Sequence, residues 1–220
     1  MSNQKKRLDF TLTPTSYFCL ALFLFSICFG WLLPSEYGKE NGPVEWLQVV
    51  VLGIAALVAL SAQFQTNLAS SRRKLIASSS IFLVLAMLRE LSWGRVFYMN
   101  NTGHIPPLKS LWFGSYVYPS IIFIVIAFFV YSFSQGLHKE LLNWLKHDRI
   151  PVLDIVIIIA AIFIADIVEH HSTGLFGKRT ELFEELFELV SYTGVLSFMI
   201  NAVYNKKVHS DEPLKLKMNI

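Results

Sequence analysis

The sequence predicts an all-α membrane protein, a bundle of six transmembrane helices with both termini in the cytoplasm. Two observations predict this fold. Of the 220 residues, 54% are hydrophobic and only 16% are charged, whereas soluble domains are nearer one quarter charged. The apolar residues also gather in blocks close to the ~20 residues that a helix needs to cross a hydrocarbon core of ~30 Å. Such a chain has no room for a sizeable soluble domain.

We expect six spans, each helical because lipid offers the backbone no hydrogen-bond partner. In chain order they cover residues 16–33, 44–64, 75–93, 116–134, 151–170 and 182–204. The first follows a basic segment, as a secretory signal would, but its apolar core is too long and lacks a small-x-small cleavage site. The expected organisation is a cytoplasmic N-terminal segment (1–15), a transmembrane domain (16–204) and a cytoplasmic tail (205–220).

The Lys and Arg residues of the connections orient the chain. The N-terminus, the second-to-third loop, the fourth-to-fifth loop and the tail together hold 13 of them, and the opposite connections hold 5. Because Lys and Arg accumulate on the cytoplasmic side, this excess places both termini in the cytoplasm. The expected location is the cell inner (plasma) membrane, with the chain crossing it several times. No nucleic-acid-binding motif is present. The expected partners are the bilayer and a lipid-linked substrate.

Charged residues recur at one depth of the predicted bundle. At ~1.5 Å per residue, Arg89 and Glu90 lie about 22 Å above the cytoplasmic end of the third span, level with Asp166 of the fifth. Glu188 of the sixth span falls near that level, and Glu45 begins the second span on the same side. A charge near the membrane centre costs on the order of 3 kcal/mol. We therefore expect these groups to face one another, a cation or a water-filled cavity.

Helical spacing places further polar groups on two faces. Asp166, Glu169 and His170 stand at i, i+3 and i+4 of the fifth span, on one face. One face of the sixth span carries the acids Glu181, Glu184, Glu185 and Glu188, and Tyr192 continues it. The first three of these acids have an alternative role in the first turn, where carboxylates favour the helix dipole. Asp154, one turn into the fifth span, is expected to be an ordinary first-turn acid.

The adjacent pair Arg89 and Glu90 is the least expected feature of the third span. Consecutive helical residues point about 100° apart and do not face each other, so each should find a different partner. We expect Arg89 to meet Asp166 or Glu188, and Glu90 to meet Arg95 or a metal. A purely structural polar contact between helices remains an alternative.

These residues suggest roles in a membrane enzyme. Arg89, Glu90 and Glu188 are the candidate catalytic residues. Glu45, Trp93 and Arg95 are the candidate substrate-binding residues. The candidate metal ligands are Asp166, Glu169, His170 and Glu184, a set that suits zinc, manganese or iron. A divalent metal cofactor would activate water or polarise a phosphoryl or acyl group at the level of the lipid headgroups.

The sequence thus favours an outward-facing polar pocket that acts on a lipid-linked or small amphipathic substrate. Two alternatives stay open: a proton- or cation-coupled transporter or channel, and a non-catalytic membrane partner whose buried ion pairs fix helix packing. Transporter sites usually lie at the midplane, and the expected depth of this site disfavours that alternative.

Three short stretches, GPVEWLQ, RELSWGR and EELFEL, together resemble a pattern in uncharacterised multi-pass prokaryotic membrane proteins. In that pattern a Glu-Trp that opens a span, an acidic-x-Ser-Trp-Gly stretch and a Glu-rich helix recur. The resemblance implies a membrane helix bundle and no particular activity. The polar set is also distantly similar to the ceramidase-like membrane hydrolases, whose metal is held by three histidines with Asp and Ser. This chain departs from them, because adjacent His170 and His171 replace their spaced histidine pair.

Overall fold

The computed structural model describes residues 8–9, 13–100, 103–147, 150–170 and 176–204. Several features used to orient the chain lie outside these residues. They are the tail, the basic residues of the N-terminal segment, and Arg149. His171 also lies outside them.

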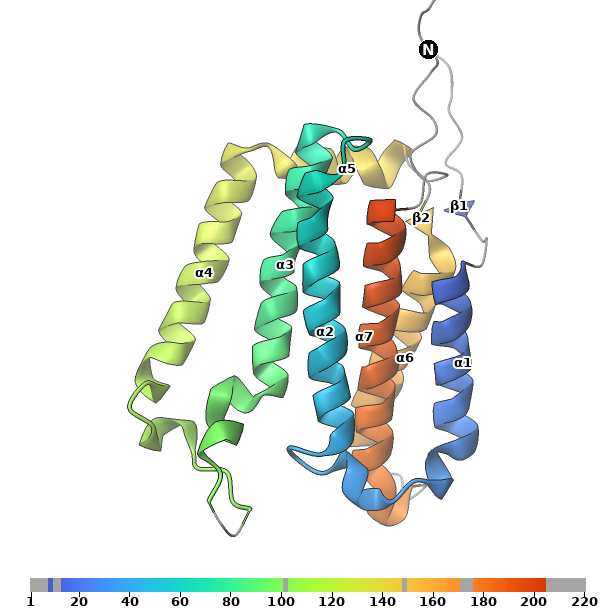
Figure 1. Ribbon diagram of the computed structural model, residues 1–220, viewed down its shortest axis with the longest axis vertical. Helices are drawn as coiled ribbons and strands as arrows, with labels where there is room; N and C mark the ends of the chain where they lie inside the picture. The colour runs from blue at the N-terminus through green and yellow to red at the C-terminus, as the bar shows by residue number, and fades with distance from the viewer. Residues whose placement is uncertain (1–7, 10–12, 101–102, 148–149, 171–175, 205–220) are drawn as a thin grey trace, which may run out of the picture.

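Where the chain is described it is almost entirely helical (Figure 1). The long helices are α1 (Pro14–Phe29), α2 (Pro43–Ser61), α3 (Ser70–Glu90), α4 (Gly114–Ser134), α6 (Val152–His170) and α7 (Thr180–Tyr204). The shorter α5 (Leu137–His147) crosses one end of the bundle. Short 3-10 turns are η1 (Gly30–Leu32), η2 (Ser35–Gly38), η3 (Ala62–Phe64), η4 (Ser92–Tyr98), η5 (Leu108–Ser110) and η6 (Gly177–Arg179). The strands β1 (Leu8–Asp9) and β2 (Ile150–Pro151) pair in parallel.

Each of the six expected segments forms a helix, and four are long and apolar enough to cross a membrane by themselves. These four are Pro14–Leu32, Pro43–Phe64, Gly114–Ser134 and Gly177–Tyr204. A fifth span results when α3 and η4, which meet at a 40° bend, are counted together. The helix α6 is also apolar but carries Asp154, Asp166 and Glu169. Apart from the two short strands, the described chain is therefore helical, with four to five helices suited to a bilayer by length and composition.

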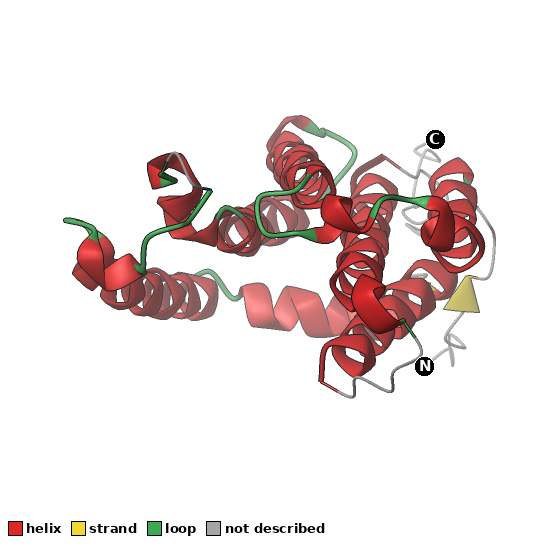
Figure 2. Cartoon of the chain, turned by 90° about the horizontal axis from the view of Figure 1, so that it is seen from below, coloured by secondary structure: helices red, strands yellow, loops and turns green. Residues whose placement is uncertain are grey.

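The helix α7 lies at the centre of the packing and contacts α6, α2 and α1. Buried residues make up 61% of its most apolar stretch, and none of the corresponding stretch of α4, which stands at the edge of the bundle (Figures 1 and 2). Small residues let α6 and α7 approach closely, as in other membrane bundles. A Cβ added at Gly194 would lie 2.6 Å from Ile158 Cγ1, and Ala161 and Ala165 are buried on the same face of α6 as Asp154.

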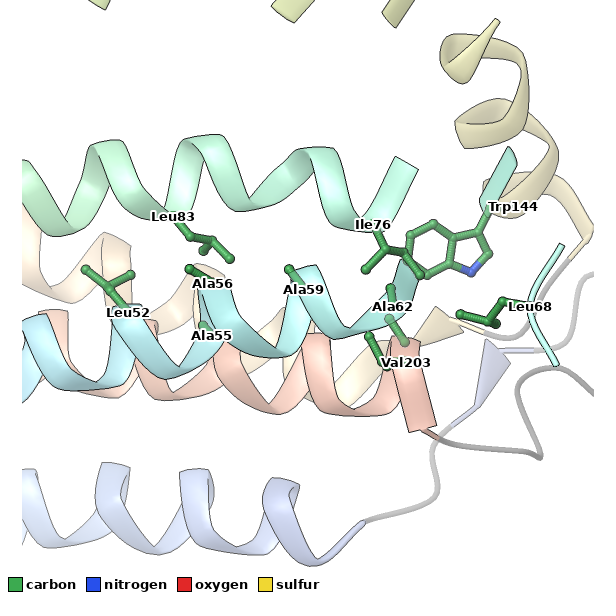
Figure 3. Close-up of a cluster of buried hydrophobic side chains, with 11 residues drawn as sticks. Leu52, Ala55, Ala56, Ala59, Ala62, Leu68, Ile76, Leu83, Trp144 and Val203 are labelled. Atoms are coloured by element: carbon green, nitrogen blue, oxygen red, sulfur yellow. The ribbon is translucent and has the colours of Figure 1, made fainter. Parts of the chain in front are cut away.

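A second contact built on small residues joins α2 to α3 and α7 (Figure 3). Ala55, Ala56 and Ala59 of α2 are buried against Leu83 of α3 and neighbouring side chains. Because alanine adds little bulk, the three backbones pack closely along this line. This packing holds the ends of α3 and α7 next to α2.

The expected loop between the fourth and fifth spans contains α5, a difference from the sequence prediction. Leu137, Leu141, Trp144 and Leu145 recur at helical spacing, and Trp144 is buried in the α2–α3–α7 cluster. The helix has only 11 residues, so a search for blocks of ~20 apolar residues passes over it. Its strong amphipathicity is typical of a helix that lies in a membrane interface.

Candidate functional site

Three carboxylates converge where α3 ends and α7 begins, at the lower end of Figure 1. They belong to Glu90 of α3 and to Glu185 and Glu188 of α7, and one oxygen of each lies within 4.8 Å of the others. Glu90 is only 5% exposed, and the other two are partly buried. We call these three residues the carboxylate cluster.

A strained turn ends α3 directly after Glu90. Ser92, Trp93 and Gly94 all have positive φ angles, of 46°, 57° and 86°. Glycine adopts this conformation readily, whereas each of the other two costs roughly 1–3 kcal/mol, a strain that concentrates at functional sites. The SWG stretch thus turns the chain away and leaves Glu90 as the last helical residue.

The face of α7 that carries Glu185 and Glu188 also carries Tyr192, one turn further along, as the sequence predicts. The Tyr192 hydroxyl donates a hydrogen bond to Glu90 Oε1 at 2.7 Å. Because Tyr192 is anchored in a packed helix, this bond fixes the Glu90 carboxylate against α7. Tyr192 therefore holds Glu90 of α3 next to the face of α7 that carries Glu188.

Arg89 lies beside the cluster. Its terminal Nη2 is 3.1 Å from Glu188 Oε1, so the structure shows the predicted contact with Glu188. Its Nε is also 3.7 Å from Glu90 Oε1, and the expectation that adjacent residues would not pair is wrong. The long side chain reaches back over its own helical turn to meet both acids. With 61% of that side chain exposed, the guanidinium lies at the surface of the site.

Gln48 of α2 also contacts the cluster, and the sequence did not reveal this contact. Its side chain is fully buried, and its Nε2 donates to Glu185 Oε2 at 2.7 Å and to the Glu185 carbonyl oxygen at 2.9 Å. Its Oε1 has no hydrogen-bond partner among the described residues. Buried polar atoms are nearly always satisfied. An acceptor oxygen is thus left next to a carboxylate of the cluster.

The charges of the site do not balance within the described chain. Three carboxylates meet one guanidinium, and two carboxylates 4.8 Å apart repel each other by about 3 kcal/mol at a dielectric constant of about 20. A hard divalent cation with oxygen ligands, such as Mn²⁺, Mg²⁺ or Ca²⁺, would neutralise this excess. The arrangement can therefore bind a metal ion through oxygen atoms.

The residues expected to hold a metal take other positions. Asp166, Glu169 and His170 all lie on an exposed face of α6, where His170 Nδ1 is 3.4 Å from Asp166 Oδ1 and 3.5 Å from Glu169 Oε2. Glu184 is partly buried on α7 but is not one of the three clustered carboxylates. Glu185, for which a role in the first turn of its helix was an open alternative, contributes its carboxylate to the cluster instead.

The expected substrate-binding residues lie in three different places. Glu45 accepts a hydrogen bond from the Asn41 backbone N–H and so joins the first turn of α2 to the segment that precedes it. Trp93 lines an apolar cavity of about 280 Å³ between α3 and α4. Arg95 donates through Nε to the Pro106 carbonyl at 2.8 Å and lines a separate cavity at the start of α4.

A second buried carboxylate lies on the inner face of α6. Asp154 is fully buried, and its Oδ2 accepts a hydrogen bond from Asn201 Nδ2 of α7 at 2.7 Å. Its Oδ1 has no hydrogen-bond partner in the part of the chain that the structure describes. It is therefore not the ordinary first-turn acid that we expected, because α6 turns this face toward α7.

The chain matches no protein-family model, no curated protein and no solved structure. Its function must therefore follow from the side chains that the fold brings together.

Proposed function

We propose that this chain is a six-span protein of the cell inner (plasma) membrane, with both termini in the cytoplasm. Its carboxylate cluster binds a divalent metal ion and supports a metal-assisted reaction on a lipid-linked or amphipathic substrate. The convergence of Glu90, Glu185 and Glu188 at one end of an apolar bundle carries this proposal. The open Oε1 of Gln48 beside Glu185 supports it, because it offers a further oxygen ligand.

The surrounding residues suit metal-assisted chemistry. An ion held by carboxylates would polarise a phosphoryl or acyl oxygen, or lower the pKa of a bound water. The exposed guanidinium of Arg89, 3.1 Å from Glu188, is placed to bind an anionic group of the substrate by paired hydrogen bonds. Tyr192 would keep Glu90 in position throughout, since its hydroxyl is anchored on α7.

Metal content tests this proposal. Purified wild-type protein equilibrated with Mn²⁺ and then desalted should retain about one ion per chain. Glu90→Gln and Glu188→Gln should each lose it, because each removes one charged ligand. Glu181→Gln is the matched control, since Glu181 is an exposed acid of the same helix outside the cluster. Wild-type protein without metal, or equal retention by all four proteins, would contradict the proposal.

The proposed orientation places the cluster on the extracytoplasmic side, with α3 and α6 as complete spans. It rests on the excess of Lys and Arg in the cytoplasmic connections, 13 against 5, and on the apolar composition of α6. Single-cysteine labelling in intact cells checks it, in a background where Cys19 and Cys28 are replaced by serine. An impermeant maleimide should label Lys39→Cys at once and Lys139→Cys only after permeabilisation. The reverse pattern would overturn the orientation.

A further inference from the structure

A cavity of about 630 Å³ lies at the start of α4, lined by residues that take no part in the carboxylate cluster. Arg95 of η4, Lys109 of η5 and the first residues of α4, Gly114 and Ser115, form its polar part. Tyr118, one turn further along α4, adds an exposed aromatic ring. The cavity thus combines two cationic side chains with a helix N-terminus.

Neither cation has an acidic partner in the described ranges of the chain. The described ion pairs include neither Arg95 nor Lys109. Arg95 is fixed by the bond from its Nε to the Pro106 carbonyl, which leaves its terminal nitrogens available. Two positive charges therefore line one cavity without a negative charge to compensate them.

The start of α4 adds to this positive potential. Among the described residues no side-chain hydrogen bond caps the helix, and its first turn contains no acid. The N-terminal end of a helix carries roughly half a positive charge, so a lysine is unfavourable there and an anion favourable. An anion in the cavity would satisfy both cations and the helix end together.

Gly114 fixes this arrangement through the backbone. A Cβ at this position would collide with the Leu108 carbonyl oxygen and would lie 2.7 Å from its carbon and 3.4 Å from Lys109 N. The turn that carries Lys109 is therefore packed directly against the first residue of α4. Close backbone contact therefore fixes the backbone of Lys109 at the helix end.

We propose that this cavity binds the phosphate group of an anionic phospholipid. The planar guanidinium of Arg95 can donate paired hydrogen bonds to phosphate oxygens, and the ammonium of Lys109 adds a second positive charge. A lipid fits better than free phosphate because α4 is apolar and unburied along its length, so that acyl chains can lie beside it. The exposed rings of Trp112 and Tyr118 suit the headgroup level. The lipid site does not depend on the metal site. It rests on the proposed function in one respect, the assignment of this end of the bundle to the extracytoplasmic leaflet.

Native mass spectrometry of the full chain, titrated with phosphatidylglycerol or phosphatidylcholine, tests this assignment. Phosphatidylglycerol should bind preferentially. Arg95→Gln and Lys109→Gln should each weaken its binding about fivefold, the effect of one cation near an anionic lipid. Lys39→Gln, which changes an exposed lysine outside the cavity, should bind as the wild type does. Equal binding of both lipids, or equal behaviour of Lys109→Gln and Lys39→Gln, would overturn the proposal.

A substitution in the first turn of α4 gives a second, charge-specific test. Ser115→Asp places a carboxylate where the phosphate should lie and should abolish the preference for phosphatidylglycerol, while Ser115→Asn should retain it. Elution of both variants at the wild-type volume in size-exclusion chromatography would show that they fold. Inorganic phosphate at millimolar concentration should not displace the lipid. If it displaces the lipid as well as added phosphatidylglycerol does, the ligand is free phosphate and the lipid assignment is wrong.

Discussion

Replacing Gly38 with alanine is expected to lower the free energy of unfolding by about 3 kcal/mol, at the upper end of the usual cost of overpacking. Gly38 is buried at the end of η2, where the connection between α1 and α2 meets the first turns of α7. An added Cβ would collide with Leu182 Cα and lie 2.6 Å from Leu182 N. Leu182 is itself fully buried, so its backbone cannot move away without displacing the helix that carries the cluster.

Thermal unfolding of the purified protein in detergent measures this effect. Gly38→Ala should lower the melting temperature by about 6–12 °C, at roughly 2–4 °C per kcal/mol for a chain of this size. Gly53→Ala is the control, because a Cβ there would meet only Met87 Sδ at 3.5 Å, an ordinary contact. It should stay near the wild-type value. Equal melting temperatures for the two variants would show that η2 does not pack closely on α7.

Replacing Glu185 with glutamine should stabilise the metal-free protein and remove its response to metal. In a chelator, the substitution relieves repulsion from Glu90 and Glu188, all within 4.8 Å. The new amide keeps an oxygen that can accept the hydrogen bond from Gln48 Nε2, so the packing is retained. We expect a gain of about 1 kcal/mol, part of the ~3 kcal/mol of repulsion per carboxylate pair at a dielectric constant of about 20.

The effect should reverse when metal is added. Wild-type protein should gain about 2.7 kcal/mol at a metal concentration one hundred times Kd, because the ion binds only the folded state. Glu185→Gln should gain little, while the control Glu181→Gln should follow the wild type in both conditions. The melting temperature in chelator measures the effect of the substitution on the metal-free protein, and the melting temperature with added metal measures the stabilisation by the ion. A Glu185→Gln variant that is destabilised in chelator would show that the carboxylates do not repel one another.

The height of each charge along its helix could be predicted from the sequence. Rise per residue is nearly constant in a helix, so counting from the ends of the apolar blocks placed Arg89 and Glu188 at one level. The structure brings these two side chains to 3.1 Å. Each predicted segment is a helix because a long apolar block in lipid can satisfy its backbone hydrogen bonds only within itself.

The rotation of each helix about its axis could not be predicted. Ile, Val and Ala surround the whole circumference of α6 between its few polar residues, so the apolar pattern does not show which face meets α7. The structure places Asp154 on the buried face and Asp166 on the exposed one. Close packing through Ala161 and Ala165 decides this rotation, and it depends on the shape of α7 as much as on α6.

Gln48 and Glu185 were the other source of error. Gln48 carries no charge, and a search for intramembrane charges passes over it, although a lone amide in an apolar helix must find a partner. Glu185 had a sufficient local explanation in the first turns of α7. Only the approach of α2 to α7 gives both residues a shared role, through the hydrogen bond of 2.7 Å between them.

The most direct test of the proposed metal site is to locate the ion itself, by anomalous X-ray scattering from crystals of the protein grown with Mn²⁺. We predict one peak within coordination distance of carboxylate oxygens from Glu90, Glu185 and Glu188. A peak on Asp166, Glu169 and His170 of α6, or none at the carboxylate cluster, would contradict the proposed site.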